Sequence, residues 1–312
     1  MQEHVKLAPA TEGVSRMPDA TRGFFFALFA YLMWGFLPLY MKAISYIPPV
    51  EIIAHRIVWS VPVAGIVLLM LGRTGDIKIA FRQPRTLAMA ALTAAIITIN
   101  WGVYVWAIAA DRAVETALGY YINPLVSMVF GALFLKERFT RLQMVALMLA
   151  TLAVVVLTLD AGGLPWVSLV LAFSFAIYGF LRKTLPVGPS QGFFLEVLIL
   201  CLPCLAYIFW LEETGQGHFF DSSFNFLMLL ASGIVTAVPL ILFAFGAKLL
   251  RISTIGIMQY LAPTMIALIG VFLFGEPFGT GRMIAFALIV SALVLYTWSM
   301  LFGAKPEPKD GR

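Results

Sequence analysis

The sequence predicts an all-α membrane protein with ten transmembrane helices, arranged as two inverted five-helix repeats. Three observations lead to this fold class. Hydrophobic side chains make up 61% of the 312 residues and charged side chains only 12%, apolar runs of bilayer length recur along the whole chain, and the chain resembles itself at a fixed offset. A soluble domain carries roughly twice this share of charged residues, so lipid must surround most of the chain.

Ten apolar runs are long enough to cross a bilayer. A hydrocarbon layer of about 30 Å requires roughly 20 helical residues. The runs fall at 23–41, 50–72, 86–108, 113–135, 141–159, 163–181, 190–211, 225–247, 254–275 and 280–302. The first run is too long for a signal peptide and no small-residue cleavage site follows it, so we expect an uncleaved first span. The short connections leave no room for a soluble domain.

Positive charges predict the orientation. The net charge is +5, but the Lys and Arg residues form no basic, aromatic-interleaved patch, and we expect no nucleic-acid partner. If the N-terminus is cytoplasmic, the opposite connections hold only Lys42, Arg112 and Arg282. This bias favours a bacterial-type inner membrane with both tails, 1–22 and 303–312, in the cytoplasm.

The internal repeat has an offset of 139 residues and joins residue types that seldom match by chance. The pairs are Arg112 with Arg251, Tyr121 with Tyr260, Pro124 with Pro263, Gly131 with Gly270, Glu137 with Glu276 and Phe139 with Phe278. The repeats, 23–159 and 163–302, each contain five spans. Because five is odd, the second copy enters the membrane from the opposite side.

Two prolines of this repeat, Pro124 and Pro263, fall near the bilayer centre. A proline inside a helix removes one backbone donor and frees the carbonyl four residues earlier, here of Tyr120 and Gln259. We therefore predict helix breaks that line a cavity where the repeats meet. The alternative is a packed kink without ligand contact.

Several segments carry a family resemblance. They are 100–107 (NWGVYVWA), 115–125 (ETALGYYINPL), 55–60 (HRIVWS) and 253–256 (STIG). These segments resemble the RarD-type permeases of the EamA family, in the drug/metabolite transporter superfamily, and the resemblance covers nearly the whole chain. It implies an inner-membrane permease built from two EamA-like repeats, with a name linked to chloramphenicol sensitivity or resistance.

Polar and aromatic side chains near the predicted centre suit a cavity for amphipathic organic solutes. They are Asn100, Trp101, Tyr104, Tyr120, Tyr121, Asn123, Gln259 and Tyr260. Such side chains can equally serve as packing or as an interfacial belt.

Ionisable groups within spans are rare and usually face a cavity or a partner. Four are candidates for a gate or for coupling: His55, Arg56, Glu115 and Glu196. Arg56 can form a structural ion pair with Glu115 or Glu51, or an outer gate that opens when the pair breaks. His55 can pack between helices or carry a proton, and Glu196 can carry a coupling proton.

These observations favour a secondary transporter, an exporter of small metabolites or drugs that works by alternating access. The sequence has no Walker A pattern or His-Glu-x-x-His helix, and Cys201 and Cys204 lie together in one apolar run. We therefore expect no catalytic residue, metal or cofactor, and expect the lipid bilayer, a small-molecule solute and a coupling proton as partners. The alternatives are a membrane enzyme acting on a lipid-linked substrate and a partner subunit that does not transport.

Overall fold

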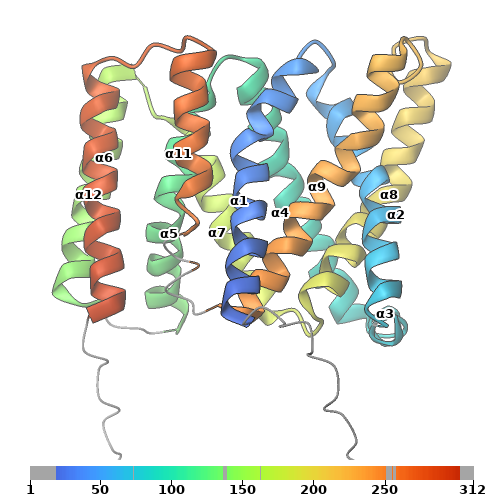
Figure 1. Cartoon of the computed structure of the whole chain (residues 1–312), viewed down its shortest axis with the longest axis horizontal. Coiled ribbons are helices and arrows are strands. Elements are labelled where there is room, and N and C mark those ends of the chain that lie inside the picture. The colour runs from blue at the N-terminus through green and yellow to red at the C-terminus, as the bar shows by residue number, and fades with distance from the viewer. Residues whose placement is uncertain are drawn as a thin grey trace, which may run out of the picture.

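The computed structural model describes residues 19–72, 74–135, 139–161, 163–250, 255 and 258–302, which are helices and connections without a strand. The helices stand side by side between two edges (Figure 1). They are α1 (Asp19–Ala43), α2 (Pro49–Met70), α3 (Gly75–Phe81), α4 (Pro84–Ala109), α5 (Ala113–Leu135), α6 (Arg141–Ala161), α7 (Trp166–Thr184), α8 (Pro189–Glu213), α9 (Ser223–Leu249), α11 (Leu261–Leu268), the π-helix η1 (Ile269–Leu273) and α12 (Thr280–Phe302).

The helix lengths agree with the predicted spans. Seven described helices, α1, α2, α4, α6, α8, α9 and α12, are long and apolar enough to cross a membrane. The remaining predicted spans correspond to α5 with 23 residues, to α7, and to α11 together with η1. In the part of the chain that the structure describes, ten helical passes therefore fit, and the seven-residue α3 is too short to be another.

Successive connections alternate between the two edges of the bundle. The connections α1–α2, α4–α5, α6–α7 and α8–α9 lie at the upper edge of Figure 1, whereas α3 and the start of α1 lie at the lower edge, as does the end of α12. An even number of passes places the start of the first helix and the end of the last helix at the same edge, as seen here. The predicted tails, except for the first turn of α1, and the repeat residues Glu137 and Arg251 lie outside the described residues.

Proline residues begin several helices. Pro49, Pro84 and Pro189 occupy the first turns of α2, α4 and α8, where the missing N–H would have no partner in the helix. At the start of α9, the Ser222 hydroxyl accepts a hydrogen bond from the backbone N–H of Asn225 at 3.1 Å. These local signals set the helix starts and so the depth of each side chain in the bundle.

The two prolines of the repeat behave differently. α5 continues without interruption through Pro124, so the predicted helix break at this position is wrong. A single proline removes one hydrogen bond, and a long helix can absorb that loss as a kink. At the second site residues 259–260 form a turn and α11 begins at Leu261, which places Pro263 in a first turn.

The two halves of the chain are interlocked. The principal packed pairs each join one half to the other: α1 with α9 and α11, α2 with α8 and α9, α4 with α7 and α8, α5 with α7 and α11, and α6 with α12. The packing is symmetric between the halves. If each helix is replaced by its counterpart in the other half (α1 by α7, α2 by α8, α4 by α9, α5 by α11 and α6 by α12, and the reverse), the same packed pairs result. The largest core cluster draws on both halves, from Met41 and Ile57 to Leu171, Leu229 and Ile266.

Candidate solute site

Arg56 lies on α2, buried among helices of both halves, with only 3% of its surface exposed. Its Nε donates a hydrogen bond to the Thr236 hydroxyl of α9 at 2.9 Å. Its Cζ lies 5.1 Å from the ring centroid of Trp101 on α4, a cation–π contact. The guanidinium therefore bridges the two halves.

The predicted ion pair of Arg56 with Glu51 or Glu115 is wrong. Glu51 accepts a hydrogen bond from the backbone N–H of His218 at 2.7 Å and lies 2.7 Å from its Nδ1. Glu115 accepts hydrogen bonds from Arg112 at 2.8 and 2.7 Å. Glu51 and Glu115 lie in the first turns of their helices and bind partners there. In addition, Glu51 is five residues from Arg56 on the same helix, a spacing that does not bring two side chains together.

Tyrosines and an asparagine continue the site beside Arg56. The rings of Tyr104 and Tyr120 lie 6.1 Å apart between centroids, tilted by 51°. The Tyr120 hydroxyl donates to Asn100 Oδ1 at 3.2 Å, and Asn100 Nδ2 donates to the Ser174 hydroxyl of α7 at 2.9 Å. Three of the predicted lining residues, Trp101, Tyr104 and Tyr120, thus lie around Arg56, and a fourth, Asn100, adjoins them through Tyr120.

Two buried polar atoms at this site have no hydrogen-bond partner among the described residues: Nη1 of Arg56 and the hydroxyl of Tyr104. Leaving a buried polar group unpaired costs about 1–3 kcal/mol, and more for a charged group. Tyr40, Tyr104 and Tyr120 all lie within electrostatic range of the guanidinium. The site therefore holds a positive charge and donors that its own residues leave unused.

The other predicted lining residues lie elsewhere. Tyr121 stacks on Tyr260 with centroids 6.2 Å apart, meets Phe286 of α12 edge-on, and shares a hydrogen bond with the Thr264 hydroxyl. Consecutive side chains on a helix point about 100° apart, so Tyr120 and Tyr121 face different neighbours. Asn123 accepts from the Ser127 hydroxyl of its own helix at 3.3 Å, and Gln259 lies in the turn before α11.

His55 is packed between aromatic side chains. Trp59 Nε1 donates to His55 Nδ1 at 3.2 Å, and the imidazole stacks on Phe219 with centroids 4.7 Å apart and planes 17° apart. This geometry favours the packing alternative for His55.

Glu196 lies on α8 with 2% of its surface exposed. The Tyr178 hydroxyl donates to its Oε2 at 3.0 Å, and Nη1 of Arg182 lies 3.4 Å from its Oε1. The buried carboxylate thus has a positive partner, unlike Arg56, which has no acidic one among the described residues.

A network at the upper edge joins the halves and includes a residue that the site prediction missed. The Glu276 carboxylate accepts hydrogen bonds from the backbone N–H groups of Ala113 and of Val114, the latter at 2.9 Å, and so caps α5. Burial raises the pKa of Glu276, whereas the two N–H donors and Arg282 oppose this shift. The repeated glutamate was the available signal for this role.

Tyr40, Thr236 and Ser174 were also missed, because each is one polar residue in an apolar run.

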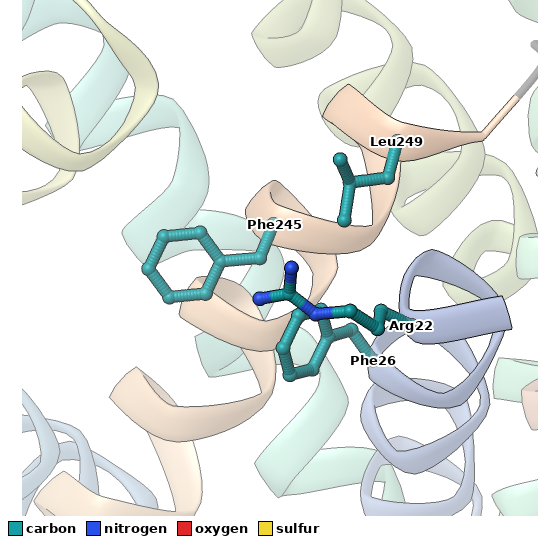
Figure 2. Close-up of a pocket in the computed structure, with 4 residues that line it drawn as sticks. All are labelled: Arg22, Phe26, Phe245 and Leu249. Atoms are coloured by element: carbon teal, nitrogen blue, oxygen red, sulfur yellow. The ribbon is translucent and has the colours of Figure 1, made fainter. Parts of the chain in front are cut away.

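The pocket in Figure 2 lies apart from the predicted lining residues. It has a volume of about 260 Å³ and is lined by Arg22, Phe26, Phe245 and Leu249, at one end of α1 and α9.

Comparisons with known proteins agree with this architecture. The family model described as "EamA-like transporter family" matches residues 21–159 and again 163–298. The chain is 43% identical over 284 residues to protein RarD of Streptomyces exfoliatus, covering 91% of this chain and 90% of that protein. It is 38% identical over 289 residues to the uncharacterized transporter YojE of Bacillus subtilis, covering 91% and 96%.

The chloramphenicol-sensitive protein RarD of Pseudomonas aeruginosa is 30% identical over 281 residues, covering 89% of this chain and 94% of that protein. A solved crystal structure matches with a TM-score of 0.58 at 20% identity, covering 88% of this chain and 97% of the other, which concerns the fold alone. Fold and relatives together define a multi-pass membrane transporter. Within that class, the chain belongs to the EamA-like transporter family and is a RarD-type permease.

Proposed function

We propose that this transporter is a secondary exporter of small amphipathic organic solutes, and that the solute binds around Arg56, Trp101, Tyr104 and Tyr120. The observation that carries the proposal is the convergence of polar and aromatic side chains from α2, α4, α5 and α9, and hence from both halves, on one buried point. A site between two halves can be opened to either side by a movement of the helices around it.

Alternating access in this proposal depends on the inverted repeat. Support comes from the two consecutive matches to one family model, from the self-consistent set of packed helix pairs, and from the odd number of spans in each half. The proposed units are 23–159 and 163–302, with both tails in the cytoplasm of a bacterial-type cell.

Labelling tests this orientation. In a chain with Cys201 and Cys204 replaced by alanine, a cysteine introduced at Asp111 should react with a membrane-impermeant maleimide on intact cells. A cysteine at Arg251 should react only after permeabilisation. Labelling of both positions from the same side would contradict the inverted arrangement.

For energy coupling we propose Glu196 in preference to His55. Glu196 is a buried carboxylate held by Arg182 and Tyr178, so a change in its protonation would loosen contacts between α7 and α8. His55 is fixed by Trp59 and Phe219. The proposed coupling predicts that Glu196→Gln transports at a rate independent of the pH gradient.

The function is tested with the purified chain in proteoliposomes, with a panel of anionic, neutral and cationic solutes and with or without a pH gradient. Chloramphenicol belongs in the panel because a relative bears its name. We expect transport of at least one amphipathic solute and a reduction of at least tenfold in Trp101→Ala. Transport of no solute of any class, by protein that is folded and inserted, would overturn the proposal.

A further inference from the structure

We propose that the transported solute is an organic monocarboxylate, and that its carboxylate binds the guanidinium of Arg56 and the hydroxyl of Tyr104. This inference rests on the proposed transport function and specifies its substrate class. It follows from the charge balance and the unused donors of the buried site.

The charge balance comes first. A guanidinium stays protonated in proteins, and a charge in the membrane interior is unfavourable unless a partner compensates it. Glu51 is bound to His218 and Glu115 to Arg112, so no described acid neutralises Arg56. A bound anion would supply the missing negative charge.

The geometry of the donors indicates which kind of anion. Nε of Arg56 is used by Thr236, whereas Nη1 points to no acceptor in the described structure, and the Tyr104 hydroxyl is likewise unpartnered. These two side chains come from α2 and α4, and each is only 3% exposed. Two separate donors match the two oxygens of a carboxylate, and hydrogen bonds to charged groups are the strongest available.

The surroundings of these donors indicate an organic body. Trp101 covers the guanidinium, and the tilted rings of Tyr104 and Tyr120 form an apolar and aromatic wall. Such faces bind hydrocarbon or aromatic groups and offer little to a hydrated inorganic ion. Among the described residues the site supplies one positive charge, that of Arg56, because the partly buried Arg182 already faces Glu196. A single charge favours a monocarboxylate over a dicarboxylate.

Matched ligand pairs test the inference on the full-length purified chain. Ligand-induced shifts in melting are measured for benzoate and benzamide, 3-phenylpropionate and its amide, indole-3-acetate and its amide, and hexanoate and its amide, with chloride and sulfate as inorganic anions. We expect at least one acid to bind about 10- to 100-fold more tightly than its amide, as loss of a charge-assisted hydrogen bond implies.

Variants assign this preference to the proposed residues. Arg56→Gln should abolish the acid-over-amide preference, Arg56→Lys should retain part of it, and Tyr104→Phe should weaken acid binding by about tenfold. Arg112→Gln is the matched control, because it removes a cation outside the site. If Arg56→Gln does not fold, the Lys and Phe variants still decide the result.

Three outcomes would overturn the inference: equal binding of acids and amides, binding of chloride or sulfate as tight as that of the acids, or no binding of any acid. The same pairs are then tested for transport in proteoliposomes. If acids bind through Arg56 but no solute of any class is transported, the transport function is refuted and the carboxylate-binding site at Arg56 and Tyr104 still stands. Transport of neutral or cationic solutes without any binding of acids would refute the monocarboxylate inference and leave the transport function standing.

Discussion

The close approach of α2 and α9 yields a sharp prediction. A Cβ added to Gly233 on α9 would lie 2.6 Å from the Cβ of Trp59 on α2 and still closer to the backbone carbonyl of Trp59. Ordinary carbon contacts are about 3.5–4.0 Å, so the helices would have to separate by roughly 1 Å. Backbone atoms cannot rotate away, and Gly233→Ala must therefore displace a whole helix.

Gly233→Ala should lower the stability of the fold by opposing contributions from packing and helix propensity. Overpacking costs roughly 1–3 kcal/mol or more, and alanine in place of a helical glycine returns up to about 1 kcal/mol. A net loss of up to about 2 kcal/mol corresponds to a fall of roughly 3 °C in melting temperature for a chain of 312 residues. Thr236 lies three residues from Gly233 on the same face of α9, so the separation should also weaken the hydrogen bond of Arg56 to Thr236 and slow transport.

Melting of the purified variant in detergent, followed by intrinsic fluorescence, measures this effect. Gly179→Ala on α7 is the matched control, since nothing lies within 4 Å of the added Cβ, and it should melt at or slightly above the wild-type temperature. If both variants melt within a degree of wild type, the packing of α2 against α9 described above is refuted.

Three further predictions concern the buried charges and the paired tyrosines. Because burial raises the pKa of Glu276 above its usual 4.5, the folded chain holds this proton more tightly than the unfolded chain. This contribution to stability is thus full below pH 4.5 and is lost as pH rises towards the folded pKa, and Glu276→Gln should flatten that part of a melting profile against pH. Arg182→Gln should destabilise the fold by about 3–5 kcal/mol by leaving Glu196 unpaired, and denaturant unfolding should show much of this recovered in the double variant with Glu196→Gln; equal losses in both would contradict the pair. Tyr120→Phe should slow transport several-fold, whereas Tyr121→Phe should cost about 1 kcal/mol of stability and leave transport intact, and the reverse result would misplace the site.

The spans could be predicted from the sequence because hydropathy is a local property. Every predicted apolar run has a helical counterpart, and Pro49, Pro84 and Pro189 begin their helices as first-turn prolines do. The family resemblance, carried by segments such as 100–107, is confirmed over most of the chain.

The contacts of the site required knowledge of how the helices pack. The opposite-charge rule paired Arg56 with Glu51 or Glu115 because these acids are predicted at the same side of the membrane, yet Glu115 has a closer partner three residues away in Arg112. The eight predicted lining residues were treated as one set, although Tyr120 and Tyr121, as neighbours on one helix, could not both face the same cavity. The contact of Thr236 with Arg56 could not be predicted from the sequence, because it depends on the packing of α9 against α2.

The cap at the upper edge of the bundle also limits how the protein can move. Glu276 belongs to the second half of the chain, but its carboxylate holds the first two N–H groups of α5 in the first half. Separating these segments would leave the two backbone N–H groups and the buried carboxylate of Glu276 without their hydrogen bonds. In the proposed alternating-access cycle, α5 should therefore move together with the connection that precedes α12, so the moving units should differ from the two sequence repeats.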